Sequence, residues 1–292
     1  MKIGFFGLGN MGGPMAANLA KAGYDVTGYD PAGSSADGVA KARSAREAAD
    51  GQDVVVTMLP NGNILRDVYD EIAGYGMKGA LYIDCSTVDV ESALYAHAKA
   101  RDAGLASLDA PVSGGVAGAA AGTLTFMVGG EEEAFQRGTP LFAIMGQKAV
   151  HCGAAGTGQS AKICNNMILG ISMIGVCEAF ALADRLGLDR QKMFDVVSTS
   201  SGSCWSLNTY CPAPGVGPKS PADNDYTPGF AAELMLKDLM LSQAAAEAAD
   251  AATPLGAAAA AFYQAFVEHG GRGKDFSAVL PRLTEMKRGD QP

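Results

Sequence analysis

Residues 2–12 read KIGFFGLGNMG, an apolar run that leads into three glycines spaced G-x-G-x-x-G. The apolar run has the composition of a buried strand, and a helix-like stretch follows from about Gly12 to Ala22. A glycine fingerprint between a strand and a helix is typical of dinucleotide-binding domains, because the turn brings backbone N–H groups and a helix N-terminus against a pyrophosphate. We therefore expect the fingerprint residues to bind a dinucleotide, namely Gly7, Leu8, Gly9, Asn10, Met11 and Gly12.

An acidic residue follows the fingerprint by about twenty positions. Asp30 ends the next strand-like run, Asp25 to Tyr29. A carboxylate at this place accepts hydrogen bonds from the adenosine ribose hydroxyls and repels a 2′-phosphate. Residues 31–33 contain no arginine that could pair with that phosphate. The sequence therefore favours NAD over NADP as the cofactor.

The rest of the first half alternates short apolar runs with segments of helical length. We expect further strands near 53–59, 81–85, 105–109, 123–128 and 149–152. Strands that alternate with helices predict a parallel sheet covered by helices on both faces.

After about Gly158 the pattern becomes helical. We expect one long apolar helix to Leu186 and Ala-rich helices near 230–250 and 254–269, with no further strand. Between them, residues 202–228 are rich in proline and lack periodicity, which indicates a functional or disordered loop.

These patterns together predict an α/β fold in two domains. Residues 1–161 are expected to form a Rossmann-type NAD-binding domain. Residues 162–292 are expected to form an all-helical domain for substrate binding and oligomerisation, joined to the first through the long helix.

The composition narrows the range of partners and locations. Hydrophobic residues make up 48% of the chain and charged residues 18%, as in a globular protein, and the formal net charge is −9. Such an acidic chain offers no general basic surface for nucleic acid or an anionic membrane. The long apolar helix could span a bilayer by length, but Asn165, Asn166 and Glu178 would be costly in lipid, so we favour a soluble helix.

The cysteines and the first residues indicate a cytoplasmic protein. Six cysteines are present without any C-x-x-C pair, which predicts reduced thiols and no metal site. Met1 leads directly into a strand-like run, so we expect no secretory signal.

A lysine on the long helix is the candidate catalytic group. Lys162 and Asn166 are four residues apart, so they share one face of an otherwise apolar helix. Burial of a lysine lowers its pKa towards neutrality, which suits general acid–base catalysis. A second candidate is the Asp109-to-Gly115 run, DAPVSGG, after a predicted strand. Its Ser113, Gly114 and Gly115 offer a hydroxyl and backbone N–H groups for a small carboxylate.

With these motifs in place, the chain resembles the β-hydroxyacid dehydrogenase family along its whole length. The matching stretches are the fingerprint, the DAPVSGG run, Gly-Thr-Leu-Thr at 122–125, Lys162 to Asn166, and LMLKDL at 234–239. Within the family, the Cys204-Trp205-Ser206 sequence and the proline-rich loop are most similar to the 3-hydroxyisobutyrate dehydrogenases.

The resemblance implies roles for individual residues. Lys162 would be catalytic, and the substrate would be held by Ser113, Gly114, Gly115 and Asn166, with Trp205 and Phe230 as pocket walls. Leu59, Pro60, Thr87 and Lys237 would join the NAD site. From composition alone, a single tryptophan is more often part of a core. Asp238 is either a partner of one of the two lysines or a surface carboxylate, and both readings stay open.

The resemblance also implies a reaction: NAD-dependent oxidation of 3-hydroxyisobutyrate to methylmalonate semialdehyde, a step of valine degradation in branched-chain amino acid catabolism. The same chemistry on another short hydroxyacid or semialdehyde (tartronate semialdehyde, succinate semialdehyde or serine) is the nearest alternative. A non-catalytic NAD-binding scaffold is a more remote one. Related enzymes pair through the helical region, so we expect a homodimer or homotetramer.

Overall fold

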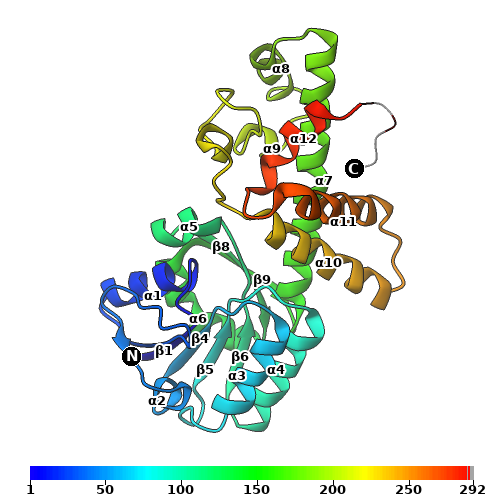
Figure 1. The fold of residues 1–292 in the computed structure, drawn as a ribbon. Helices are drawn as coiled ribbons and strands as arrows, with labels where there is room; N and C mark the ends of the chain where they lie inside the picture. Colours follow the sequence, from blue (N-terminus) through cyan, green and yellow to red (C-terminus); the bar gives the residue numbers. More distant parts are fainter. Residues whose placement is uncertain (288, 290–292) are drawn as a thin grey trace. The chain divides into compact units, whose positions relative to one another are not determined.

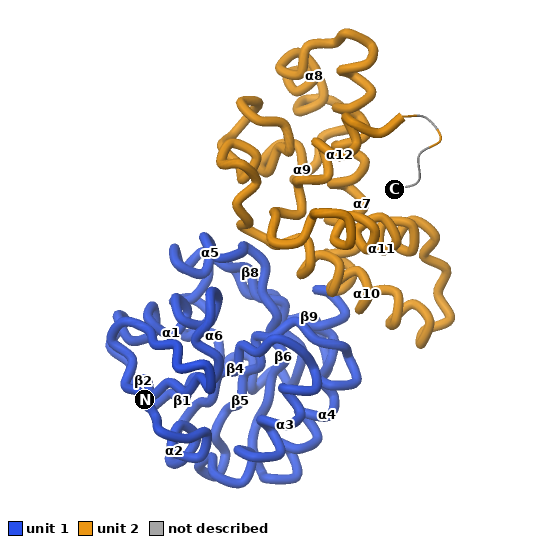
Figure 2. Tube along the Cα trace, in the orientation of Figure 1, with its two compact units in different colours: residues 1–162 blue, residues 163–292 orange. Residues whose placement is uncertain are grey.

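The chain divides into two compact units (Figure 2). The computed structural model describes residues 1–287 and 289. The first unit comprises Met1–Lys162, and the second begins at Ile163. Each unit has its own hydrophobic core.

The described part of the first unit contains one nine-stranded sheet, in which β1 to β6 run parallel in the order β3-β2-β1-β4-β5-β6 (Figure 1). The chain therefore has the predicted parallel-rich α/β architecture. The strands are β1 (Lys2–Phe6), β2 (Asp25–Tyr29), β3 (Ala40–Lys41), β4 (Val54–Thr57), β5 (Leu81–Asp84), β6 (Ala106–Asp109), β7 (Val112–Ser113), β8 (Leu124–Gly130) and β9 (Gly146–Gly153).

The predicted parallel sheet has antiparallel strand pairs at one side. Strand β8 runs antiparallel to both β6 and β7, and β9 runs parallel to β8. The helix between β7 and β8 is α5 (Gly115–Ala121), whose seven residues span only about 10 Å. A parallel connection needs a longer crossover. The chain therefore enters β8 at the same end of the sheet at which it leaves β7, and the two strands run antiparallel.

Alternating side chains on each strand fill two core layers, one on each face of the sheet. Ile3 and Phe5 belong to one layer, whereas Phe6 belongs to the other. The first layer lies under α1 (Gly12–Lys21), α5 and α6 (Glu132–Met145). The second lies under α2 (Ala45–Ala49), α3 (Gly62–Ile72) and α4 (Val90–Asp102). Helices thus cover both faces, as the alternation of strands and helices predicts.

The described residues of the second unit are helical. Its core gathers Met173, Cys177 and Phe180 of the long helix with apolar residues of the later helices. The helices are α7 (Thr157–Leu186, which begins in the first unit), α8 (Arg190–Val197), α9 (Trp205–Asn208), η1 (Pro221–Asn224), α10 (Ala232–Ala248), α11 (Pro254–Phe266), η2 (Val267–Gly271), η3 (Phe276–Ala278) and α12 (Val279–Glu285).

The proline-rich segment 202–228 is more ordered than its sequence indicated. It contains α9 and the short helix η1, and a capping box begins η1: the Ser220 hydroxyl accepts a backbone N–H, and Asp223 accepts the N–H of Ser220. Asp223 also accepts the N–H of Gly215 at 2.7 Å. Side-chain-to-backbone bonds of this kind replace the regular ladder that periodicity would reveal.

Helix α7 is long and apolar enough to cross a membrane by length and composition. Core helices of soluble proteins pass the same test, and its polar residues Lys162 and Asn166 are buried and hydrogen-bonded.

Candidate active site

The glycine fingerprint follows β1 at the carboxyl edge of the sheet. Strand β1 lies between β2 and β4, the point at which the strand order reverses. In open α/β sheets, ligands bind outside the strand ends at this switch point. Helix α1 begins at Gly12, the last residue of the fingerprint, and no side chain of the described residues caps its N-terminus. The fold thus brings residues 7–12 to the position where a dinucleotide would meet the helix N-terminus.

The three fingerprint glycines differ in whether the surrounding protein leaves room for a side chain. Gly7 has a φ of 85°, and a Cβ there would lie 2.2 Å from the Met58 carbonyl oxygen. A Cβ on Gly12 would lie 1.9 Å from the carbonyl oxygen of Gly7. Packing of the protein therefore requires the first and third glycines. A Cβ on Gly9 would meet no atom of the described residues within 4 Å, so the space beside this backbone is available to a ligand.

Asp30 holds the fingerprint loop from the end of β2. Its Oδ2 accepts the Leu8 N–H at 2.8 Å, and its Oδ1 accepts the Ala32 N–H at 2.8 Å. Each carboxylate oxygen keeps a further lone pair that can accept a ribose hydroxyl. Sequence reasoning proposed only the ribose contact and missed the contact with the loop. An open hollow of about 530 Å³ covers this region and is lined by Leu8, Gly9, Asn10, Gly13, Pro14, Ala17, Ser34, Ser35, Ala36, Asp37 and Val116.

Three further predicted cofactor residues follow the next two strands: Leu59 and Pro60 come after β4, and Thr87 comes after β5. Strands β1, β4 and β5 are parallel, so these loops lie at the same edge of the sheet as the fingerprint. A buried carboxyl group connects these loops. Asp84 Oδ1 accepts a hydrogen bond from the Ser86 hydroxyl at 2.6 Å, and Ser86 Oγ in turn accepts the Leu59 N–H at 2.8 Å. Burial raises the pKa of Asp84 to about 6. Sequence reasoning missed Asp84, because an acidic residue that ends an apolar strand is equally compatible with a solvated turn.

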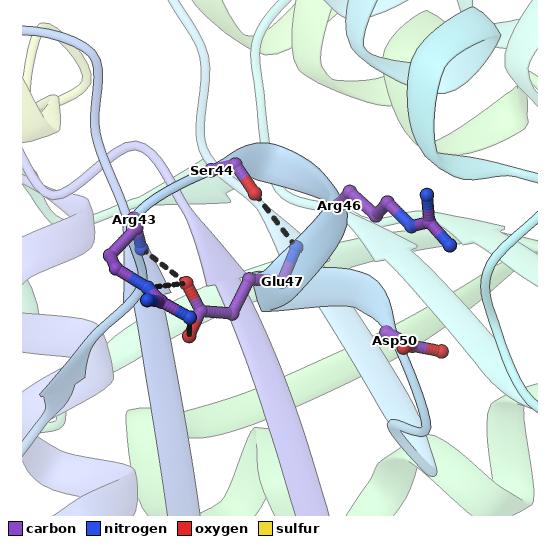
Figure 3. Close-up of a pocket in the computed structure, with 5 residues that line it drawn as sticks. All are labelled: Arg43, Ser44, Arg46, Glu47 and Asp50. Atoms are coloured by element: carbon purple, nitrogen blue, oxygen red, sulfur yellow. Dashed lines mark hydrogen bonds and ion pairs between the residues drawn. The ribbon is translucent and has the colours of Figure 1, made fainter.

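A second hollow, of about 580 Å³, lies beside α2 and is lined by Arg43, Ser44, Arg46, Glu47 and Asp50 (Figure 3). Arg43 Nε lies 3.1 Å from Glu47 Oε2, so this cation is paired within the same short segment. Arg46 points away from that pair, and its guanidinium lies 4.7 Å from the centre of the Tyr75 ring. Both cations are engaged by the protein itself, so we assign this surface a structural role.

The lysine of α7 reaches the DAPVSGG segment. Lys162 is only 7% exposed, and its Nζ donates a hydrogen bond to the Val112 carbonyl oxygen at 2.8 Å. Val112 directly precedes Ser113, and the next two residues, Gly114 and Gly115, have φ angles of 135° and 61° that favour glycine. Within the first unit, the structure therefore brings the amine of Lys162 to the start of the segment predicted to bind a carboxylate.

In the second unit, Asp238 connects two predicted residues. Asn166 donates its amide N–H to Asp238 Oδ2, and Lys237 Nζ lies 3.1 Å from Asp238 Oδ1. Asp238 is 3% exposed, so the surface-carboxylate reading is wrong and the lysine-partner reading holds for Lys237. Asn166 lies one turn after Lys162 on α7, so the two side chains share a face of that helix.

The two predicted aromatic residues belong to one chain of rings. Trp205 stacks on Tyr210 with 4.9 Å between centroids, and Phe230 packs edge-on against Phe276 at 5.6 Å. Tyr210 and Phe276 are themselves 5.3 Å apart. Trp205 is 50% exposed, so it is not a core residue.

A buried carboxylate orders the backbone beneath these rings, and sequence reasoning missed it. Asp275 Oδ2 accepts the Tyr210 hydroxyl at 2.8 Å and the N–H groups of Gly229 and Phe230 at 3.0 Å. Burial and the neighbouring carboxylate raise the pKa of Tyr210. Asp275 thus fixes both aromatic residues of the predicted pocket, one through its stacking partner and the other through its backbone.

Two family models match the chain and together cover most of its length. Residues 2–153 match the NAD-binding domain of 6-phosphogluconate dehydrogenase. Residues 156–283 match a domain described as NAD-binding of NADP-dependent 3-hydroxyisobutyrate dehydrogenase. NAD is therefore the cofactor class that both halves of the chain indicate.

Full-length relatives agree with these matches. A probable 3-hydroxyisobutyrate dehydrogenase of Mycobacterium tuberculosis is 50% identical over 287 residues, which cover 96% of this chain and 97% of the relative. An NAD-dependent L-serine dehydrogenase of Pseudomonas aeruginosa is 47% identical over 286 residues, covering 95% and 96%. The solved structure of Mycobacterium tuberculosis 3-hydroxyisobutyrate dehydrogenase with L-serine has a TM-score of 0.92 at 49% identity, covering 97% of this chain and 98% of that chain. The chain belongs to the 3-hydroxyisobutyrate dehydrogenase family and is an NAD-dependent hydroxyacid oxidoreductase.

Proposed function

We propose that this enzyme oxidises 3-hydroxyisobutyrate to methylmalonate semialdehyde with NAD, as a step of valine degradation. The observation that carries the proposal is the buried Lys162 amine, which is hydrogen-bonded at Val112 beside the Ser113–Gly115 segment. A proton-accepting group next to a carboxylate anchor is what oxidation of a short hydroxyacid requires.

Lys162 acts as the general base. Its neutral amine takes the hydroxyl proton of the substrate while the carbinol C–H bond breaks, so that a carbonyl forms and the amine becomes an ammonium. NAD, when bound, would supply the acceptor for the hydride that leaves this carbon. In the reverse direction, the Lys162 ammonium returns the proton to the carbonyl oxygen. Burial of the lysine supports this role because desolvation favours the neutral amine.

The remaining residues bind and orient. Ser113, Gly114 and Gly115 hold the substrate carboxylate through a hydroxyl and backbone N–H groups. Asn166 faces the reacting oxygen. Its amide is held on both sides, because Asp238 accepts from its Nδ2 and Asn165 donates to its Oδ1 at 2.8 Å. One amide hydrogen is left to donate to the substrate.

The pocket walls and the cofactor residues complete the assignment. Trp205 and Phe230 contact the apolar part of the substrate, and Lys237 contacts the cofactor or substrate. NAD is held by Gly7, Leu8, Gly9, Asn10, Met11, Gly12, Asp30, Leu59, Pro60 and Thr87. The open space at Gly9 and the carboxylate of Asp30 fit a pyrophosphate and an unphosphorylated ribose respectively.

L-Serine is the second candidate substrate, since one relative is named a serine dehydrogenase and one similar structure contains L-serine. Serine and 3-hydroxyisobutyrate share the hydroxymethyl group and the carboxylate, and differ by an ammonium in place of a methyl. Trp205 and Phe230 offer apolar surface, and the rings of Tyr210 and Phe276 pack against them, which favours the methyl. Tartronate semialdehyde and succinate semialdehyde follow the same chemistry and belong in the same substrate panel.

Substitution of Lys162 tests the catalytic role and separates it from a non-catalytic scaffold. We expect Lys162→Met to lower kcat by about 10²- to 10⁴-fold, the usual contribution of a positioned acid–base group. Cofactor binding, measured by fluorescence in a titration with NADH, should be retained. Lys192→Met, at an exposed lysine of α8, is the matched control and should leave kcat unchanged. Wild-type turnover in Lys162→Met would contradict the proposal.

We also propose a cytoplasmic homodimer or homotetramer. Ile168, Leu182 and Leu186 are exposed and follow one side of α7, where a second copy of the chain would cover them. This contact explains why a soluble enzyme has a helix so rich in apolar residues. Light scattering after gel filtration should give a dimer or tetramer mass, and a monomer at micromolar concentration would contradict this part of the proposal.

A further inference from the structure

The N-terminus of α7 is held by a carboxylate from the sheet. Asp109, the last residue of β6, accepts the Gly156 N–H through Oδ1 at 2.8 Å and the Gln159 N–H through Oδ2 at 2.9 Å. The first N–H groups of a helix have no partner within the helix, and an anion next to them is stabilising. Asp109 is therefore a cap for α7, contributed by a strand far away in the sequence.

Glycines allow this close approach. A Cβ on Gly158 would lie 2.4 Å from the Met127 carbonyl oxygen and 2.5 Å from the Asp109 carbonyl oxygen. A Cβ on Gly129 would lie 2.5 Å from Asp109 Oδ1. Gly156 has a φ of 83°, which favours glycine. The G-x-G pattern that precedes Lys162 thus serves to place the start of α7 directly against the ends of β6 and β8.

A histidine of α4 adds a third hydrogen bond to the same carboxylate. His97 Nε2 lies 2.9 Å from Asp109 Oδ1, and His97 Nδ1 lies 2.7 Å from the Ser107 hydroxyl oxygen. The order Ser–His–Asp matches that of a nucleophilic triad. Here, however, the carboxylate also accepts two helix N–H groups, so the three residues form a support for α7.

The supported part of α7 carries the proposed catalytic lysine. Lys162 lies three residues after Gln159, and its amine is bonded to Val112, three residues after Asp109. The segment 109–112 therefore contacts the first two turns of α7 twice, once through the Asp109 carboxylate and once through the Val112 carbonyl. Any shift of the helix start moves the Lys162 amine relative to Ser113–Gly115, the segment proposed to bind the substrate carboxylate. A misplacement of about 1 Å can cost about 10²-fold in rate.

We propose that Asp109 is a positioning residue that fixes the Lys162 amine relative to Ser113–Gly115. The inference rests on the proposed role of Lys162 in catalysis. An asparagine at position 109 keeps one oxygen acceptor but turns an NH₂ group towards the second helix N–H. Asp109→Asn therefore replaces one attractive contact with a repulsive one without changing the size of the side chain.

The test is a double-mutant cycle with Lys162→Met, using the full-length enzyme. We expect Asp109→Asn to lower kcat by about 10- to 100-fold, while the Kd for NAD and the KM for the hydroxyacid change by less than about threefold. In the Lys162→Met background, the same substitution should have no further effect on residual turnover measured at high enzyme concentration. Asp189→Asn is the matched control, because Asp189 caps α8 through the Lys192 N–H and should leave kcat unchanged.

Each other result has a distinct meaning. Wild-type kcat in Asp109→Asn, or an equal loss in both backgrounds, would overturn the positioning role and leave Asp109 a purely structural cap. Wild-type turnover in Lys162→Met would instead refute the proposed function. If Asp109→Asn does not fold, His97→Gln takes its place in the cycle. His97→Gln removes the contact between the imidazole ring and Asp109 but keeps both hydrogen bonds from the helix N–H groups. We therefore expect kcat to fall by about 3- to 10-fold, and we expect no such fall in the Lys162→Met background. An unchanged kcat in His97→Gln would then overturn the inference.

Discussion

Gly9→Ala should separate cofactor binding from folding more cleanly than any other single change in the fingerprint. Within the part of the chain that the structure describes, the Cβ of an alanine at this position meets no atom within 4 Å, and Gly9 is not among the glycines with positive φ. We therefore expect the free energy of unfolding to change by less than about 0.5 kcal/mol. The added methyl instead enters the space that the pyrophosphate would use.

The expected loss of NAD affinity follows from the contacts that the methyl would displace. A hydrogen bond from a backbone N–H to a charged phosphate oxygen contributes about 1.5–3 kcal/mol. Loss of one such bond corresponds to a Kd for NAD that is about 10- to 100-fold weaker. Because the pyrophosphate takes no part in the proton or hydride transfer, kcat at saturating NAD should fall much less than affinity.

Two measurements on the same samples would test this prediction. Competition of NAD with fluorescent NADH gives the Kd for NAD, and urea unfolding gives the free energy of unfolding. Gly12→Ala is the matched control, since its Cβ would lie 1.9 Å from the Gly7 carbonyl oxygen and should cost roughly 1–3 kcal/mol of stability. Wild-type NAD affinity in a folded Gly9→Ala variant would refute the placement of the pyrophosphate at Gly9. A strongly destabilised Gly9→Ala variant would refute the claim that the protein leaves this space open.

Three further substitutions test other parts of the site. Burial raises the pKa of Asp84 to about 6, so the folded protein binds this proton more tightly than the unfolded chain. The free energy of unfolding should therefore rise by up to about 3 kcal/mol as the pH falls from 7 to 4, and urea unfolding should show that Asp84→Asn lacks this component. Asp30→Ala should lower the NAD-to-NADP ratio of kcat/KM by at least about tenfold in steady-state assays, and an unchanged ratio would exclude the ribose contact. Trp205→Ala should raise the KM for the hydroxyacid by about tenfold while Tm stays within a few degrees, because the ring is half exposed; an unchanged KM would remove Trp205 from the pocket.

Local patterns made much of the fold predictable. The strand before Gly7, the helix after Gly12 and the long helix through Lys162 each follow from a periodicity or a motif within a few residues. The antiparallel direction of β8 could not be read in this way. It depends on how far α5 carries the chain, and a seven-residue helix is recognised only when its bounds are known.

The buried carboxylates were the larger omission from the site. Asp109 and Asp275 each accept several hydrogen bonds from donors in other segments, up to 65 positions away, and Asp84 accepts the Thr57 hydroxyl from 27 positions away. In the sequence, an aspartate after an apolar run is equally compatible with a solvated turn. Only the long-range partners distinguish the two, so the sequence reveals which residues meet a ligand more readily than which residues hold them in place.

The most direct test of the proposed function is a comparison of kcat/KM for both enantiomers of 3-hydroxyisobutyrate, L-serine and the two semialdehydes. The wild-type enzyme should be assayed by NADH formation for the hydroxyacids and NADH consumption for the semialdehydes, with NADP(H) in parallel. We expect one enantiomer of 3-hydroxyisobutyrate with NAD to exceed every other combination by at least about tenfold, the discrimination that one methyl-sized difference allows. A higher kcat/KM for L-serine would contradict the proposed substrate while keeping the proton-transfer role of Lys162, and no turnover of any of them would contradict the proposed function itself.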